Sequence, residues 1–223
     1  MQLNLETSLE SDLAAALDSL PTRRSGPENI GQRLGLSAQA IGTHTQQTRH
    51  RTFVDGRGQV AAELIKRLPR PGEAIHFLMD GTFTLANCIP VIQSQIGEPC
   101  ELTVATLGLN DATTDTLAAM LRAGTLAGLR LAISAYFRAT DPETADRAVR
   151  VLKEHGAQVA VERMHAKLQL WQPATKPARY VLETSSNLRS CNCIEAVALT
   201  NDAALYRWHN RWLTEFFERN AIQ

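Results

Sequence analysis

A histidine and a lysine two residues apart precede a short apolar segment, and a hydroxyl-rich segment follows further along the chain. His165 and Lys167 belong to the run Met-His-Ala-Lys-Leu-Gln-Leu-Trp, and the second run is Thr184-Ser185-Ser186-Asn187. Alternate residues of a strand lie on one face, so a strand here would place His165, Lys167 and Gln169 together. An imidazole, a fixed cation, a hydroxyl and a carboxamide are the groups that a phosphoryl-transfer site requires. The two segments therefore predict phosphodiester chemistry.

The chain that carries these segments alternates between strand and helix patterns after the breaker Pro69-Arg-Pro-Gly72. The predicted strands cover residues 74–80, 102–107, 129–137, 159–164, 166–171, 179–183 and 195–200. Helices are predicted over residues 85–96, 111–123 and 141–155, and a last helix from about Ala203. Asp141 is expected to cap the third helix, with Gly156 at its end. This alternation predicts an α/β fold, a layered α/β/α sandwich with a mixed, partly parallel sheet.

The chain before the breaker has weak periodicity, and it is predicted to be a separate extension. Residues 1–72 would form a mainly helical or irregular N-terminal extension, and residues 73–223 the α/β domain. Between residues 22 and 70 there are nine Lys and Arg residues against three acids. This local excess of positive charge favours contact with a polyanion, although the whole chain has 23 cations and 23 acids.

Residues 30–44 allow two interpretations. They fit the turn and second helix of a helix-turn-helix, in which the groove-facing and phosphate-contacting residues would be Gln39, Thr43, His44, Arg49 and Arg51. The other interpretation is a flexible basic arm, because the glycines and threonines of this stretch weaken a helix.

The composition is that of a soluble protein, and we expect a cytoplasmic location without a membrane partner. No run approaches the roughly 18 apolar residues that cross a bilayer, and the first twenty residues carry acids but no Lys or Arg. The four cysteines, Cys88, Cys100, Cys191 and Cys193, are then expected to be reduced. Their spacing does not match a zinc site, so no metal is predicted.

The two polar segments resemble the phospholipase D superfamily, whose motif is His-x-Lys, four residues, Asp, and then Gly-Ser-x-Asn. His165-Ala-Lys167 matches the first part, and Thr184-Ser-Ser-Asn187 matches the second with Thr in place of Gly. The family's Asp falls on Gln172, a departure shared with the tyrosyl-DNA phosphodiesterases of the superfamily. The resemblance extends from about Gly72 to the C-terminus and implies a phospholipase D-like fold.

The resemblance also implies roles for five residues. His165 would attack phosphorus, Lys167 and Asn187 would hold the non-bridging oxygens, and Ser185 would add a hydrogen bond. Glu195 would orient the imidazole. Sites of this family use two histidines, and this chain has one copy of the motif. The resemblance therefore implies a homodimer with the site at its two-fold axis, without a metal or another cofactor.

Three functions remain open from the sequence. The first is a metal-independent nuclease that acts on nucleic acid through a covalent phosphohistidine. The second is a phospholipid hydrolase or phosphatidyl transferase, which the absence of a basic amphipathic segment disfavours. The third is a non-enzymatic nucleic-acid-binding module with a decayed site, suggested by Gln172 and Thr184.

Overall fold

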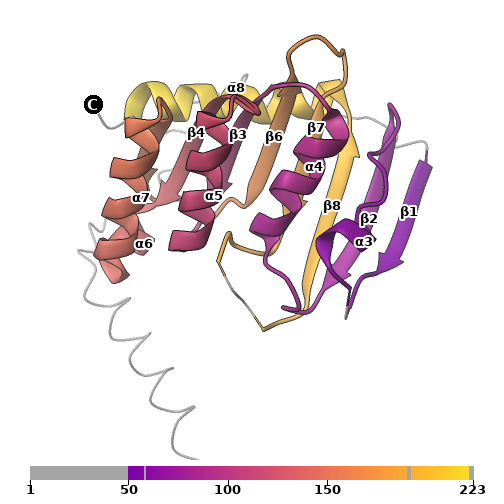
Figure 1. Ribbon diagram of the computed structural model, residues 1–223, viewed down its shortest axis with the longest axis horizontal. Coiled ribbons are helices and arrows are strands. Elements are labelled where there is room, and N and C mark those ends of the chain that lie inside the picture. Colours follow the sequence, from indigo (N-terminus) through magenta and orange to yellow (C-terminus); the bar gives the residue numbers. More distant parts are fainter. Residues whose placement is uncertain (1–49, 58, 190–191, 221–223) are drawn as a thin grey trace, which may run out of the picture. The chain divides into compact units, whose positions relative to one another are not determined.

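The computed structural model describes residues 50–57, 59–189 and 192–220. Its centre is a single eight-stranded sheet (Figure 1). The strands are β1 (His50–Asp55), β2 (Glu73–Met79), β3 (Cys100–Thr106), β4 (Leu126–Ser134), β5 (Gln158–Glu162), β6 (Leu168–Pro173), β7 (Tyr180–Thr184) and β8 (Glu195–Asn201). The predicted mixed, partly parallel sheet is confirmed.

The strand order is β1-β2-β8-β7-β6-β3-β4-β5. β3, β4 and β5 are parallel, as are β1 and β2, whereas β6 and β8 pair antiparallel with their neighbours on both sides. It follows that the C-terminal ends of six strands and the N-terminal ends of β6 and β8 lie at one edge of the sheet. Sheets of this kind place their functional side chains beyond the carboxyl ends of the parallel strands.

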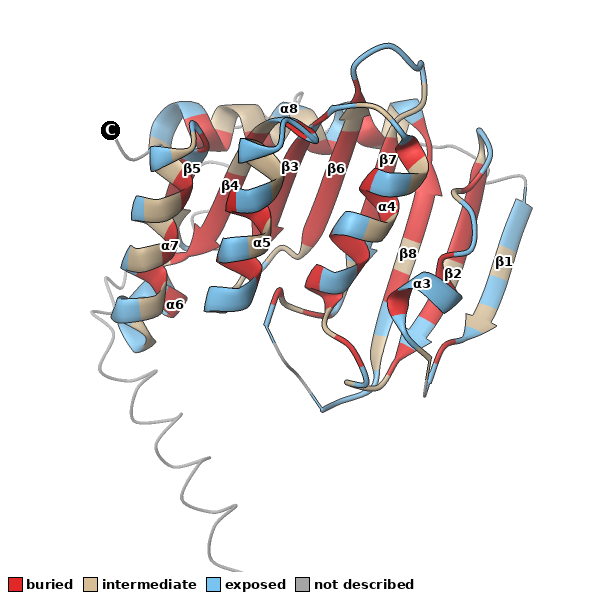
Figure 2. Cartoon of the chain, in the orientation of Figure 1, coloured by how far each residue is buried: buried red, intermediate tan, exposed pale blue. Residues whose placement is uncertain are grey.

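Helices cover both faces of the sheet, so the predicted three-layer architecture is confirmed (Figure 1). The helices are α3 (Ala61–Leu64), η1 (Leu85–Asn87), α4 (Cys88–Ile96), α5 (Asp111–Arg122), α6 (Ala135–Thr140), α7 (Pro142–Glu154) and α8 (Ala203–Asn220). Two buried clusters result (Figure 2). The larger lies on the side of α4, α5 and α7, and the smaller lies between the sheet and α8.

The structure adds a strand before the predicted domain boundary and shortens one predicted strand. β1 precedes residue 72, yet it pairs in parallel with β2, so the sheet continues on the N-terminal side of the predicted domain boundary. The strand predicted over residues 129–137 is wrong in its last three residues, which begin α6. The reason is Ser134, whose side chain accepts a hydrogen bond from the Tyr136 backbone N–H at 3.2 Å and caps the new helix.

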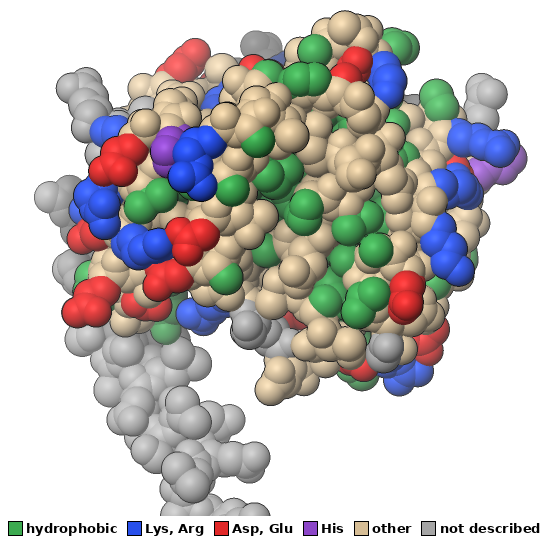
Figure 3. Space-filling view, in the orientation of Figure 1, with side chains coloured by type: hydrophobic (Ala, Val, Ile, Leu, Met, Phe, Trp, Pro, Cys, Tyr) green, Lys and Arg blue, Asp and Glu red, His purple; other side chains and the backbone are tan. Residues whose placement is uncertain are grey.

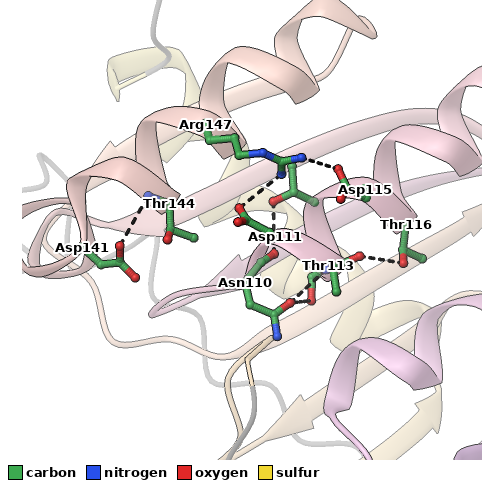
Figure 4. A network of polar contacts seen from close by, with 10 residues as sticks. Asn110, Asp111, Thr113, Asp115, Thr116, Asp141, Thr144 and Arg147 are labelled. Carbon is green, nitrogen blue, oxygen red and sulfur yellow. Dashed lines mark hydrogen bonds and ion pairs between the residues drawn. The ribbon is translucent and has the colours of Figure 1, made fainter.

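Polar contacts link the helices of the larger layer. Arg147 of α7 contacts Asp111 at 3.2 Å and Asp115 at 2.6 Å, both on α5 (Figure 4). Charged side chains of both signs gather over α7 and its neighbours in the space-filling view (Figure 3). These pairs are largely exposed, so each contributes little to stability and mainly fixes how α5 and α7 meet.

A buried carboxylate holds the first parallel pair of strands. Glu73 at the start of β2 accepts two hydrogen bonds from the Arg67 guanidinium, at 2.6 and 2.7 Å, and one from the Arg70 backbone N–H at 2.8 Å. These contacts, the Arg67 bond foremost, lower the pKa of Glu73 from 4.5 to about 2. A folded-state pKa below the unfolded value stabilises the fold above the unfolded pKa.

We therefore predict that acid destabilises the protein partly through Glu73. Its contribution is complete above pH 4.5 and is lost as the pH falls toward 2. The variant Glu73→Gln should have a lower free energy of unfolding than the wild type at pH 7. This difference between the two proteins should become smaller as the pH falls from 4.5 toward 2. Urea unfolding at several pH values measures it, with the exposed Glu63→Gln as control. A pH-independent difference would contradict the assignment.

Candidate active site

The five predicted catalytic residues lie in three segments at the edge where the strand ends meet. His165 and Lys167 lie between β5 and β6, Ser185 and Asn187 follow β7, and Glu195 is the first residue of β8. His165 and Lys167 thus precede the strand on which the sequence placed them, because β6 begins only at Leu168. The antiparallel pairing of β6, β7 and β8 brings the three segments together.

The imidazole and the ammonium are in contact. Lys167 Nζ lies 3.3 Å from Nδ1 and 3.4 Å from Nε2 of His165, so the ammonium lies against the ring at similar distances from both nitrogens. His165 is exposed, and Lys167 is half-buried. Burial lowers the pKa of Lys167, and the nearby charge of Glu195 opposes this shift. The backbone N–H of Thr184 donates to the Lys167 carbonyl at 3.2 Å, which joins the two motif segments directly.

Ser185 and Glu195 form a second contact at the same edge. The Ser185 hydroxyl donates to the Glu195 carboxylate and accepts from the Ala196 backbone N–H at 3.1 Å. Among the described residues, the carboxylate therefore accepts from Ser185 and not from His165. The orienting role of Glu195 on the imidazole stays a prediction, whereas the carboxylate of Glu195 raises the pKa of Lys167 against the larger effect of burial.

Asn187 is oriented by the end of β3. Its side-chain Oδ1 accepts from the Leu107 backbone N–H at 3.2 Å. Within the described part of the chain its amide nitrogen has no partner, so two N–H donors are available to a ligand. The next residue is fixed as well, since the Leu188 N–H donates to the Gly108 carbonyl at 3.1 Å. Gly108 is required there, because a Cβ would lie 2.8 Å from the Phe137 ring.

These anchors are functional residues that the sequence analysis missed. Leu107, Gly108 and Thr113 belong to the segment after β3, far from the motif in sequence, and no local pattern distinguishes them. The Thr113 hydroxyl lies 2.8 Å from the Leu188 carbonyl oxygen and 2.8 Å from Oδ1 of Asn110, the residue that caps α5. The helix cap therefore also positions the loop that carries Asn187.

We predict that Thr113→Val reduces activity by about 10-fold, because loss of the hydrogen bond to Leu188 would displace Asn187. Valine has the shape of threonine but does not hydrogen-bond Leu188. Thr113→Ser keeps the hydroxyl and should retain most of the activity, whereas a purely volume-dependent effect would spare valine and impair the smaller serine. Steady-state kinetics on both variants, with thermal unfolding to correct for stability, make the comparison.

Gln172, which takes the position of the family's Asp, lies away from the edge. Its Oε1 accepts from the Tyr206 hydroxyl at 3.0 Å, which links the far end of β6 to α8. The carboxamide has a structural contact there, and the substitution leaves the His165–Lys167 contact intact.

Several predictions concern residues outside this edge. Gln39, Thr43, His44 and Arg49 lie outside the described residues, and Arg51 is exposed on β1. In the described ranges no group of three His, Cys, Asp or Glu side chains is arranged to hold a metal ion. None of the helices described has the length and apolar character needed to cross a membrane.

No protein-family profile matches the chain, and no curated protein sequence matches it. Solved structures do match. Nuc, a phospholipase D family member from Salmonella typhimurium, has 13% identity and a TM-score of 0.48 over 67% of this chain and 97% of its own. Polyphosphate kinase from Porphyromonas gingivalis has 11% identity and a TM-score of 0.50 over 72% of this chain and 26% of its own. Phosphatidylserine synthase from Haemophilus influenzae Rd KW20 has 13% identity and a TM-score of 0.48 over 67% of this chain and 39% of its own.

Nuc is a phospholipase D family member, and the chain has a phospholipase D-like fold, as the motif indicated. At such low identity the match concerns the fold alone. The chemistry of the site depends on its own residues.

Proposed function

We propose that the protein is a metal-independent nuclease that works through a covalent phosphohistidine in a site shared by two subunits. The observation that carries the proposal is the contact between His165 and Lys167 at the carboxyl edge of the sheet. It puts a nucleophile and a cation within reach of one phosphate group. Asn187 adds two N–H donors on the neighbouring loop, fixed through Leu107.

The reaction has two displacements. In the first, a ring nitrogen of His165 attacks phosphorus, the bond to the leaving oxygen breaks, and His165 of the partner subunit donates a proton to that oxygen. In the second, the partner's His165 takes a proton from water, the resulting hydroxide attacks phosphorus, and the phosphorus–nitrogen bond breaks. The products are an alcohol and a phosphate monoester. Lys167 and Asn187 stabilise the charge on the non-bridging oxygens in both steps.

Nucleic acid is favoured as substrate by the basic stretch between residues 22 and 70. For the described residues of this stretch, the structure indicates which positive charges are paired. Arg57 pairs with Asp55, and Arg67 pairs with Glu73, so these two charges are already matched. Arg51, Lys66 and Arg70 are exposed, and Arg51 lies on the edge strand β1. The positive charges of these three residues lie near the sheet and would attract a phosphate backbone.

Incubation with supercoiled plasmid DNA and with RNA, each with and without EDTA, tests the proposal. Cleavage that EDTA does not inhibit, with a phosphorylated protein trapped by rapid acid quench, is the expected result. Retardation of DNA without cleavage would point to the binding module instead, and hydrolysis of phosphatidylcholine vesicles without nucleic-acid cleavage to the lipid enzyme. Sedimentation of the full chain should give a dimer, and a monomer at assay concentrations would contradict the shared site.

A further inference from the structure

A groove lies on the face of the sheet that α8 covers, and it begins beside the candidate active site. α8 packs on β5, β6 and β7, and β1 and β2 lie beyond its end (Figure 1). The groove that results has a volume of about 600 Å³. Its lining comes from β1, β2, β7 and β8 and includes Thr184 and Ala196, the neighbours of Ser185 and Glu195.

One side of the groove is aromatic. The Phe53 ring of β1 stacks on the His76 imidazole of β2, with centroids 5.3 Å apart and an interplanar angle of 21°. Phe53 is 74% exposed, which is unusual for a phenylalanine on a sheet. Ala196 and Ala198 of β8 are small and leave room beside these rings. A flat ring could enter here and stack, as bases do on aromatic side chains of sheet faces.

The other side presents a fixed carboxylate. Glu183 Oε1 lies 3.0 Å from Nε2 of the buried His209, and the Trp212 indole N–H donates to Nδ1 of that histidine at 3.2 Å. Because Nδ1 accepts, Nε2 carries a proton and donates to Glu183. This bond lowers the pKa of Glu183, which favours the charged form. Among the described residues, Oε2 of Glu183 has no hydrogen-bond partner, although the nearby His76 also lowers the pKa of this carboxyl, so the groove contains one oriented acceptor.

These features select the occupant. A purely apolar group would remove water from Glu183 Oε2 without giving that oxygen a donor, which is unfavourable. A planar ring with an amino group satisfies both sides, and a carboxylate accepts well from the amino group of cytosine. Thymine and uracil instead present a carbonyl oxygen at that position, which a carboxylate repels.

We infer that the groove binds an unpaired, amino-bearing nucleobase of the substrate strand, stacked at His76 and Phe53 and hydrogen-bonded to Glu183. The inference rests on the proposed nuclease function and adds a preference for single strands with cytosine or another amino-bearing base beside the cleaved bond. Glu183 is separated from Ser185 by one residue, so the end of β7 would hold the base and the segment after it would contact the phosphate.

The test uses the full chain carrying His165→Asn, which prevents cleavage during binding. Fluorescence anisotropy at low salt measures the affinity for labelled oligo-dC and oligo-dT of equal length. We expect oligo-dC to bind about 10-fold tighter, the discrimination of one good base contact. Adding Glu183→Gln should abolish or reverse this preference, because His209 would hold the amide oxygen and the amide N–H₂ would face the groove as a donor.

Two further variants sharpen the result. Phe53→Ser should weaken both oligonucleotides, since stacking does not depend on the base edge. Glu154→Gln, an exposed site on α7, should change nothing. Equal affinity for oligo-dC and oligo-dT that Glu183→Gln does not alter would overturn the groove assignment, as would a Phe53→Ser variant whose only change is loss of the dimer. Metal-independent cleavage by the wild type decides the proposed function separately, so the two can fail independently.

Discussion

Replacing His165 by asparagine is expected to reduce phosphodiester cleavage by at least about 1,000-fold, because the reaction loses both its nucleophile and its general acid. Asparagine keeps polarity and approximate size but neither attacks phosphorus nor transfers a proton. His165 is exposed, and among the described residues Lys167 is the one side chain within hydrogen-bond distance of its ring. The free energy of unfolding should therefore change little. The measurement is single-turnover cleavage of a labelled oligonucleotide, with His155→Asn, a half-buried position after α7, as control.

The same variant tests whether two subunits share one site. When wild-type and His165→Asn subunits are mixed in equal amounts and allowed to exchange, about a quarter of the dimers contain two wild-type histidines. A shared site that needs both histidines should therefore retain about a quarter of the activity, whereas independent sites should retain about half. Full activity of the His165→Asn variant on its own would exclude the proposed nucleophile.

The fold could be predicted from the sequence wherever local signals were strong. Strand periodicity located most of the sheet, and Asp141, which accepts from the Thr144 N–H, caps α7 as expected. The misassigned end of β4 shows the limit of such signals. Residues 135–137 are apolar or aromatic and continue a strand pattern, whereas the decisive event is the capping bond of Ser134, which depends on backbone geometry.

β1 shows a second limit. Its residues alternate between exposed and half-buried, so the segment has little apolar content, and it is held by pairing with β2 and by the contact of Thr52 with Glu73. A strand with this burial pattern cannot be separated from a polar loop by periodicity alone.

The candidate site also has residues that the sequence indicates and residues that it does not. The groups that would meet the phosphate have types and spacing that indicate their chemistry, so the sequence alone proposes them. Their supports could not, because Thr113 lies 75 residues before Leu188, and only the folded sheet brings them together. The Glu195 contact with Ser185 also depends on where β7 ends and β8 begins, whereas the family resemblance implied the imidazole as the partner of Glu195.

Lys167→Met is expected to lower kcat by about 100- to 1,000-fold with a smaller change in KM, because the ammonium acts mainly on charge that develops in the transition state. Methionine preserves an unbranched side chain of similar length and removes the charge together with its N–H donors. Its half-buried position makes the substitution tolerable for the fold, and loss of the Glu195 interaction is the main electrostatic change in the free protein.

Lys167→Arg separates charge from geometry. Arginine keeps a cation but places a wider, planar group against the imidazole, so we expect partial activity, between the wild type and Lys167→Met. Lys153→Met, near the end of α7, controls for the loss of one positive charge from the whole molecule. If Lys167→Met raised KM alone and left kcat unchanged, the ammonium would bind substrate and transition state equally. The contact between Lys167 and His165 would then serve capture of the substrate phosphate and not the chemical step.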